Sequence, residues 1–473
     1  MVEFWPFTLA LFLFLPVAYL LLKHLTVSST YPKQIPEGTM GWPVVGETLS
    51  FLKPHESYTM GSFLQDRCSR YGKVFKSHLF GSPAIVSCDH ELNTYILQNE
   101  RKLFPPSYPK VMHDILGEYG MILITGDIHK KLRNVIVNIV RDTKSESHYL
   151  RCVEKLSLST LKSWVDCKEV AFYEEAKQVA LHVMLQYLLH IDLEEPVALK
   201  LLTDFETYIK GFVSLPLKLP GTAYTKAMKA RVRVISSLKE ILQERRSKGF
   251  DRLAEGGDYL HIILVNENLN EEEMVSLVFD MLFGGYETTA KLLSLVVYFL
   301  SKAPNAFQKL KEEHETIRRS KKDGEPLSWE DYQNMKFTNN VIYEASRCGN
   351  IVKFLHRKAL KDIKYKDFVI PSGWLVVPVL SAPHLDSTIH ENPQEFNPWR
   401  WEDETTMKKV APFGGGPHLC PGFDLAKVEI SFFLHHFILN YRWKTKVDEY
   451  PLAYPYVEFT RGLQLEIEPV MDM

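Results

Sequence analysis

The sequence lacks several patterns that would assign it to common protein classes. Its six cysteines form no C-x-x-C pair and no closely spaced framework, which disfavours a structural zinc site and a disulfide-stabilised secreted domain. The formal net charge is −2 over 473 residues, so we expect no nucleic-acid partner. Beyond about residue 50 there is no Ser/Gly linker, low-complexity tract or internal repeat, which predicts one large domain.

A long apolar run is present at the N-terminus. Trp5 to Leu22 is an uncharged run of 18 residues, close to the length that a helix needs to span a membrane. Glu3 precedes it and Lys23 follows it, whereas a cleaved signal peptide begins with a basic region. We therefore expect residues 1–30 to be a retained, single-pass anchor with the rest of the chain in the cytosol. A proline-rich connector is expected over residues 31–50 and the domain over residues 51–473.

The periodicity of apolar residues predicts a mainly α fold with a minor β-sheet. Helical spacing dominates from about residue 57 to residue 346. The longest predicted helix starts at Asn270 and ends before Pro304, and another helix starts at Ser328. Strand patterns come later in the chain. Residues 368–370 and 374–377 predict a hairpin, and residues 462–467 predict a terminal strand.

A glycine-rich loop near the C-terminus carries the most informative cysteine. Residues 413–422 read FGGGPHLCPG and are followed by a helical pattern. Glycines at this density let the backbone approach something flat. Cys420 is expected just before a helix N-terminus, where free N–H groups and the helix dipole stabilise a thiolate. The pattern suits a metal-binding cysteine, and the alternative is a turn with a buried structural cysteine.

This loop resembles the haem signature of the cytochromes P450, F-x-x-G-x-[R/H]-x-C-x-G. The resemblance implies one large domain of that fold with haem b, whose iron Cys420 ligates and which Phe413 and Gly422 contact. It also implies a monooxygenase that uses O2 and takes electrons from NADPH through NADPH-cytochrome P450 reductase. His418 stands where the family more often has an arginine that meets a haem propionate, and histidine can also donate to a carboxylate.

The long predicted helix contains the sequence FGGYETT at residues 283–289. Two adjacent glycines inside a helix cost about 1 kcal/mol each relative to alanine, so they indicate that something needs the space. Glycines for helix packing and threonines bonded back to carbonyls are the alternative. The segment is similar to the family element [A/G]-G-x-[D/E]-T. By that similarity Glu287 and Thr288 are the acid and the alcohol of a proton relay.

A predicted ion-pair triad comes next. Glu344 and Arg347 share a helix face, which alone usually indicates a solvated pair. The segment 396–401 resembles the family segment whose arginine, here Arg400, completes a Glu-Arg-Arg triad. The resemblance implies a structural role beneath the haem-binding core.

Further positions resemble family contacts to the haem propionates. They are His129 and Arg133, which share a helix face, and Arg357, with His129 replacing the commoner tryptophan. Ordinary surface charge is the alternative. Lys130, Lys131 and Lys427 could form a basic patch for an acidic electron donor, or a solvated face.

Segments at residues 284–291, 348–360 and 396–401 resemble plant steroid side-chain hydroxylases of the brassinosteroid pathway, especially the C-22 hydroxylases. This resemblance implies a membrane-bound enzyme of the endoplasmic reticulum that hydroxylates a lipophilic sterol. Leu282, Val352 and Phe459 are candidate pocket walls. The alternatives are hydroxylation at C-23, C-16 or C-26 or of another terpenoid, an oxygen-independent haem-thiolate isomerase or dehydratase, and a non-catalytic haem-binding protein.

Overall fold

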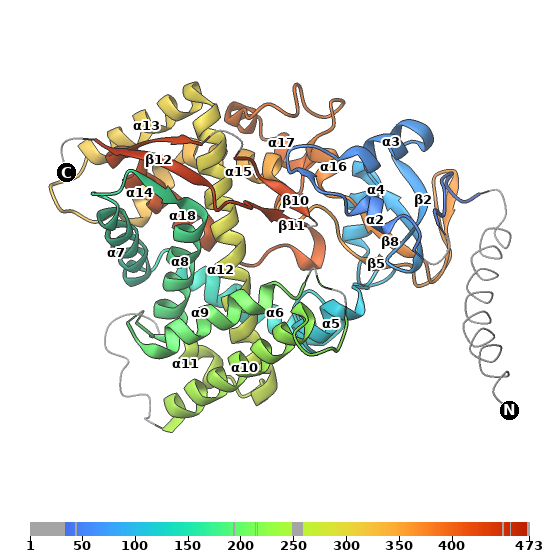
Figure 1. Ribbon diagram of the computed structural model, residues 1–473, viewed down its shortest axis with the longest axis horizontal. Coiled ribbons are helices and arrows are strands. Elements are labelled where there is room, and N and C mark those ends of the chain that lie inside the picture. Colours follow the sequence, from blue (N-terminus) through green and yellow to red (C-terminus); the bar gives the residue numbers. More distant parts are fainter. Residues whose placement is uncertain are drawn as a thin grey trace, which may run out of the picture.

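The computed structural model describes residues 34–470 except 43–44, 193, 213, 215, 248–258, 447–448 and 455. Helices make up most of this part of the chain (Figure 1). The α-helices are α2 (Thr48–Phe51), α3 (Ser62–Tyr71), α4 (His90–Gln98), α5 (Lys110–Leu116), α6 (Gly126–Thr143), α7 (Ser147–Ser163), α8 (Phe172–Met184), α9 (Pro196–Ile209), α10 (Ala223–Ser247), α11 (Tyr259–Leu264), α12 (Glu271–Lys302), α13 (Pro304–Arg319), α14 (Trp329–Asn334), α15 (Lys336–Gly349), α16 (Ser381–His384), α17 (Thr406–Lys409) and α18 (Phe423–Asn440). A π-helical turn, η1 (Leu185–Leu189), and two 3-10 turns, η2 (Pro398–Glu402) and η3 (Gly416–His418), accompany them.

The strands form small sheets at the edges of the helical body. Four strands pair in the order β2 (Val74–Leu79), β3 (Ser82–Ser87), β8 (Leu375–Pro378), β5 (Arg357–Lys358). Two three-stranded sheets have the orders β1 (His55–Glu56), β10 (Leu452–Tyr454), β11 (Tyr456–Glu458) and β4 (Glu169–Ala171), β12 (Gln464–Pro469), β9 (Tyr441–Thr445). The strands β6 (Ile363–Tyr365) and β7 (Phe368–Ile370) form a separate pair. The fold is therefore mainly α with minor sheets, as predicted.

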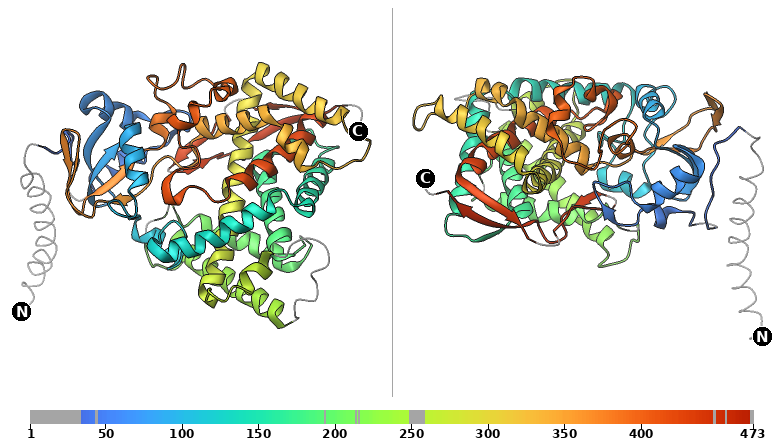
Figure 2. Two further views of the ribbon diagram at one scale, coloured as in Figure 1. Left: turned by 180° about the vertical axis from the view of Figure 1, so that it is seen from behind. Right: turned by 90° about the horizontal axis from the view of Figure 1, so that it is seen from above.

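Helix α12 runs through the middle of the molecule, as the views in Figures 1 and 2 show. It begins with a capping box in which the Asn270 side chain accepts from the Glu273 N–H and the Glu273 carboxylate accepts from the Asn270 N–H. Most of its side chains are buried in the two large core clusters, one near each end. The predicted helix between Asn270 and Pro304 is confirmed, because both its cap and its stop signal are local.

The second predicted helix start is also confirmed, but the helix is interrupted. Ser328 caps α14 in a capping box with Asp331. The chain leaves helical geometry at Met335, and α15 then carries Glu344 and Arg347.

Two strand predictions need correction. Residues 368–370 pair with β6, and residues 375–378 pair with β3 and β5, so they form no hairpin with each other. Strands β2 and β3 pair within a stretch in which helical spacing was expected to dominate. In both places tertiary pairing partners outweigh local pattern. The terminal strand is confirmed as β12, which starts two residues later than its pattern.

The predicted anchor lies outside the described residues. In the part of the chain that the structure describes, no helix is both long enough and apolar enough to cross a membrane. The described part of the predicted connector packs on the domain, because the Lys76 N–H donates to the Glu37 carbonyl and Glu47 is buried. The bounds of the connector and of the domain stay a prediction.

Candidate active site

The glycine-rich loop places Cys420 immediately before α18. The loop is held by backbone bonds: the Cys420 N–H donates to the Phe413 carbonyl, and the Leu419 N–H donates to the Gly416 carbonyl. Gly414 and Gly416 have φ values of +77° and +64°. At Gly416 a Cβ atom would lie 2.2 Å from the Leu97 carbonyl oxygen. The turn therefore requires glycine there, both for its φ value and for its contact with α4.

The sulfur of Cys420 is buried and is also supplied with hydrogen-bond donors. Burial raises the pKa of the Cys420 thiol, and hydrogen bonds from the Gly422 and Phe423 N–H groups and the nearby Arg133 charge act against that rise. The side chain is nevertheless partly accessible. A cysteine that is desolvated, accessible and supplied with backbone donors fits a metal-binding thiolate.

The two adjacent glycines of α12 have different surroundings. A Cβ atom on Gly285 would lie 2.6 Å from the Met184 sulfur, so Gly285 allows α8 to pack closely on α12. A Cβ atom on Gly284 would meet nothing within 4 Å. One glycine therefore serves helix packing, and the other borders open space. The helix is continuous through both residues.

Thr288 lies one turn after Gly284 and faces the same open space. Its side chain is exposed, while those of Glu287 and Thr289 on either side are buried. The Thr288 hydroxyl donates to the Gly284 carbonyl at 2.5 Å. An exposed hydroxyl in the middle of a core helix is available to a ligand in that space.

Glu287 is held in a buried polar network. Its Oε1 accepts from the Tyr173 hydroxyl at 2.7 Å and lies 2.8 Å from the Lys291 Nζ. The Lys291 Nζ also lies 3.5 Å from Oε2 of Glu458, whose side chain is half-exposed. Burial alone would raise the pKa of the Glu287 carboxyl, but Lys291 and Tyr173 outweigh it and lower the pKa. Glu287 is thus an ionised, immobilised acid beside Thr288.

His129 and His418 lie against each other. Their rings stack with centroids 4.0 Å apart. Burial, His418 and Arg133 lower the pKa of His129 to about 4, so its ring is neutral near pH 7. The His418 Nε2 lies 3.2 Å from the Ile124 carbonyl oxygen, and its Nδ1 contacts the Glu100 carboxylate.

Glu100 is a site residue that the sequence did not reveal. It is buried and contacts His418 and the Arg357 Nη2, the latter at 3.2 Å. Burial opposes ionisation, but His418 and Arg357 outweigh it and lower the pKa of the Glu100 carboxyl. No local motif marks Glu100, because its partners lie more than 250 residues away along the chain.

Arg133 and Arg357 differ in their surroundings. Burial lowers the pKa of Arg133, while the Cys420 charge raises it, so the guanidinium lies within electrostatic reach of the sulfur. Arg357 is fully buried, and its Nε has no hydrogen-bond partner in the described part of the chain. Both ring nitrogens of His129 also lack such partners there.

Glu344, Arg347 and Arg400 meet in one buried cluster. Arg347 donates to both Glu344 oxygens, at 2.7 and 2.8 Å, and the Arg400 Nε donates to Oε1 at 2.9 Å. The Trp401 indole N–H and the Asn397 backbone N–H complete the set of donors to Glu344. Burial would raise the pKa of Glu344, but the two guanidinium groups outweigh it and lower the pKa. The pattern indicates a buried, fully paired carboxylate.

The structure also shows how exposed the predicted pocket walls are and whether the lysines of the predicted basic patch are free at the surface. Leu282 and Phe459 are 0% and 2% exposed and pack in the core clusters, and their role as pocket walls stays a prediction. Val352 is 45% exposed. Lys427 is buried, with its Nζ 3.1 Å from the Tyr343 hydroxyl, and Lys131 pairs with Glu273. These two lysines are therefore not a free surface patch.

These surroundings fit haem, which is a flat group with two carboxylates. A Cβ atom on Gly422 would meet nothing within 4 Å, as at Gly284, so glycines on α12 and beside Cys420 both border open space. Arg357 and His129 carry buried polar nitrogens without partners. Unpaired buried nitrogens are expensive, and a carboxylate could accept from the guanidinium and from a ring N–H.

Three comparisons identify relatives of the chain. The family described as "Cytochrome P450" matches residues 36–460. Cytochrome P450 724B1 of Oryza sativa subsp. japonica is 52% identical over 460 residues, 95% of each chain. A cholesterol 22-monohydroxylase of Paris polyphylla is 41% identical over 97% of this chain and 99% of its own. The solved structure of a retinoic acid-bound cyanobacterial CYP120A1 is 25% identical, with a TM-score of 0.82, and covers 93% of this chain and 100% of its own. The chain belongs to the cytochrome P450 family.

Proposed function

We propose that this chain is a haem-thiolate monooxygenase that hydroxylates a steroid or sterol side chain at C-22, using O2 and electrons from NADPH. The observation that carries the substrate class is the set of relatives named as 22-hydroxylases. Several cholesterol 22-hydroxylases and steroid (22S)-hydroxylases are 40–42% identical over at least 92% of this chain. Their similarity extends through both the cysteine loop and α12.

In this proposal Cys420 holds haem b, and the residues around it fix the group in place. Arg133, Arg357 and His129 would meet the propionates, and His418 would do so on leaving Glu100 or the Ile124 carbonyl. Phe413 and Gly422 would lie against the ring. Haem bound through a thiolate supplies the activation of dioxygen and the transfer of one oxygen atom to a C–H bond. The backbone N–H groups of Gly422 and Phe423 would favour the charged form of the sulfur, against the effect of its burial. The Glu344–Arg347–Arg400 triad would fix the polypeptide behind the loop.

Thr288 and Glu287 would supply protons at the open side of α12. The Thr288 hydroxyl can donate to a water or ligand in the open space when it leaves the Gly284 carbonyl. Glu287 can transfer a proton when its carboxylate breaks its contacts with Lys291 and Tyr173, or when a water molecule bridges it to Thr288. This predicted pair argues for oxygen chemistry over an oxygen-independent isomerase or dehydratase, and over a haem carrier.

A second candidate is hydroxylation at a further position of the same substrate. A relative from Trigonella foenum-graecum that is 41% identical over 92% of both chains is named a cholesterol 16,22-dihydroxylase. Similarity at this level is compatible with one oxidation or with two. The number of oxygen atoms inserted is therefore part of the test.

We further propose that the chain works at the cytosolic face of the endoplasmic reticulum membrane, anchored by residues 1–30, and that NADPH-cytochrome P450 reductase is its electron donor. The support is the apolar run at Trp5 to Leu22 and the lipophilic substrates named for the relatives.

The test is product analysis of the reconstituted full chain. Protein, reductase, NADPH and a panel of cholesterol and plant sterols are incubated under 18O2, and the products are analysed by mass spectrometry. We expect one 18O atom at C-22, or two with a second at another side-chain or ring position. Turnover without 18O in any product would refute monooxygenation, and 18O only at positions other than C-22 would refute the regiochemistry.

A further inference from the structure

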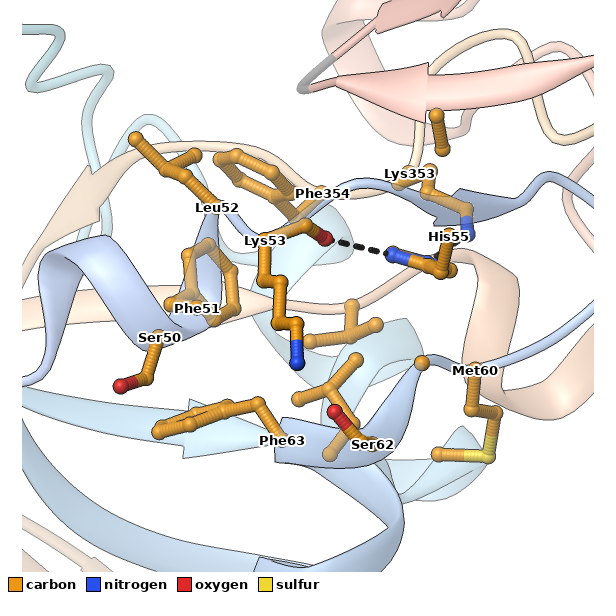
Figure 3. A pocket seen from close by; sticks show the side chains of 14 residues that line it. Ser50, Phe51, Leu52, Lys53, His55, Met60, Ser62, Phe63, Lys353 and Phe354 are labelled. Carbon is orange, nitrogen blue, oxygen red and sulfur yellow. Dashed lines mark hydrogen bonds between the residues drawn. The ribbon is translucent and has the colours of Figure 1, made fainter.

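A small cavity lies in the N-terminal part of the domain, between α2, β1 and the start of α3 (Figure 3). Its volume is about 30 Å³, whereas one water needs on the order of 10–15 Å³, so it accommodates about two water-sized atoms. A sterol ring system is far too large for it. Fourteen residues line the cavity, and none is a carboxylate. The cationic groups among them are Lys53, Lys353 and, when protonated, His55.

Lys353 is the unusual member of this set. Its side chain is 6% exposed, and its ammonium has no ion pair among the described residues. The Nζ contacts the His55 Nε2 at 2.5 Å and the Thr59 carbonyl at 2.9 Å, which uses two of its three N–H donors. A buried ammonium without a counter-charge is unfavourable, so such a lysine either loses its proton or gains an anion.

The acidic neighbour does not supply that anion. Glu56 follows His55 on β1, but its carboxylate interacts with the Tyr58 hydroxyl and is not part of the cavity wall. His55 cannot supply negative charge, and burial followed by the Lys353 charge lowers its pKa. The His55 Nδ1 lies 3.0 Å from the Lys53 carbonyl, so a neutral ring that donates there presents Nε2 as the acceptor for Lys353.

The first turn of α3 adds backbone donors to the same cavity. Gly61 to Leu64 line it, and Gly61 at the N-cap provides no side-chain cap. The N–H groups of a first helical turn have no partner inside the helix, and the helix dipole favours an anion there. In Figure 3 the Lys53 side chain extends toward Ser62, at the beginning of this helix. Two lysines and an uncapped helix end thus converge on one small space.

From this arrangement we infer that the cavity is a binding site for a phosphate monoester, whose oxygens would enter between Lys353, Lys53 and the first turn of α3. Two cations and a helix end match a dianion, and the volume matches the leading oxygens of such a group. The ligand chemistry has two sources, inorganic phosphate and the headgroup of phosphatidic acid. Leu49 and Trp42 lie close in sequence to the residues that line the cavity, and they are 75% and 80% exposed. Exposed apolar side chains can contact the acyl chains of a lipid, so they favour the lipid as the source. The site is independent of Cys420 and of the proposed reaction.

The expected pH dependence of phosphate binding distinguishes this site from a surface lysine that attracts phosphate by its charge alone. Burial lowers the pKa of Lys353 to about 7 in the free protein. The titratable or charged groups around it in the cavity are His55 and Lys53, neither of which is an acid. Bound phosphate would stabilise the protonated lysine, so binding should take up a proton and weaken as the pH rises from 6.5 to 8.5. The phosphate itself gains negative charge over this range, so an ordinary surface lysine would bind it more tightly.

The test measures binding by the full chain in neutral detergent micelles. Inorganic phosphate is titrated at constant ionic strength and followed by 31P NMR, and dioctanoyl phosphatidic acid is compared with dioctanoyl phosphatidylcholine. Lys353→Met is the main variant. Lys53→Met removes an exposed lysine and does not threaten the fold, and Lys364→Met is the matched control, because Lys364 is exposed on β6 outside the cavity.

We expect Lys353→Met to raise the Kd for the phosphate monoester at least about tenfold and Lys53→Met to raise it severalfold, with Lys364→Met unchanged. Tighter binding of phosphatidic acid than of inorganic phosphate would assign the site to lipid, and equal binding would assign it to the free ion. The inference is overturned if neither probe binds the wild type more tightly than Lys353→Met. It is also overturned if Lys53→Met binds as the wild type does, or if phosphatidylcholine binds as well as phosphatidic acid.

Discussion

The Lys291 ammonium lies 2.8 Å from the Glu287 carboxylate, one turn away on α12. This pair is buried, and the Tyr173 hydroxyl donates to the same carboxylate oxygen. The acid that would accompany Thr288 is therefore ionised and already bonded when no ligand pulls it away. The charge state of Glu287 therefore depends on a lysine of the same helix. Five experiments test this pair and other residues of the site and the core.

Replacing Lys291 by methionine should destabilise the fold through Glu287. A buried carboxylate without its cation costs about 3–5 kcal/mol. In the wild type the lowered pKa means that this pair stabilises the protein at neutral pH and loses its effect as the pH falls through that pKa. In the variant the pKa of Glu287 should rise, so stability should improve as the pH falls. Urea unfolding at pH 7 and pH 5 measures both effects. Lys291→Arg keeps the charge and should behave as the wild type, and equal urea midpoints for Lys291→Met and wild type at pH 7 would contradict the assignment.

Thr288→Ala should uncouple NADPH oxidation from product formation. The hydroxyl faces open space and is the proposed proton donor there. Positioned acid–base groups contribute about 10²–10⁴ in rate, so the fraction of NADPH electrons recovered in product should fall by about tenfold or more. NADPH consumption, peroxide and product are measured together. Thr289→Ala changes a buried neighbour and should keep its coupling. Unchanged coupling in Thr288→Ala would remove the residue from the relay.

Glu344→Gln should prevent stable haem incorporation. The amide leaves Arg347 and Arg400 without a buried counter-charge, which costs about 3–5 kcal/mol. Haem content and the carbon monoxide difference spectrum report the loss. Glu91→Gln is the control, because Glu91 pairs with Lys366 at the exposed surface, where water and salt screen the interaction. Wild-type haem content in Glu344→Gln would show that the triad is dispensable.

Cys420→Ser should abolish the thiolate-type carbon monoxide spectrum. The hydroxyl is far less acidic than a thiol, so the loop donors at Gly422 and Phe423 can no longer hold a charged ligand. Cys167→Ser, at a partly exposed cysteine, should leave the spectrum unchanged. A thiolate-type spectrum in Cys420→Ser would assign the ligand to another cysteine.

Glu429→Gln should stabilise the protein above pH 7. Burial raises the pKa of Glu429 to about 7, against the hydrogen bond from Tyr149. A carboxyl with a raised pKa opposes folding increasingly as the pH rises from its ordinary value through 7, by about 3 kcal/mol in full. The variant should therefore have the higher unfolding midpoint at pH 8 and lose this advantage toward pH 5. A midpoint at pH 8 equal to or below the wild type would contradict the buried, titrating Glu429.

Local patterns were sufficient for several features. The capping box at Asn270 and the proline at the other end predicted α12, because both signals act on neighbouring residues. The loop at residues 413–422 identified Cys420, since a turn of this kind needs its glycines and its cysteine contiguous in sequence. The same contiguity made the family recognisable.

Other predictions failed where partners distant in sequence decide. The turn at residues 371–373 resembles a hairpin turn, yet β7 and β8 join different sheets, because β3 offers β8 a parallel partner. Leu282 and Phe459, which we predict as pocket walls, are buried in the core clusters, and a sequence does not distinguish apolar core residues from apolar pocket residues.

The sequence by itself determined the mainly helical fold, the glycine-rich loop that carries Cys420 and the central helix α12. The tertiary structure decided which charges meet. It joined Glu100 to His418 and Arg357, Lys291 to Glu458, and Lys353 to His55, and it divided the two glycines of α12 between packing and open space. The physical reason is the distance along the chain over which each interaction acts. Helix caps and turns depend on residues a few positions apart, whereas the ionisation of a buried group depends on the segments that fold against it, however distant in sequence.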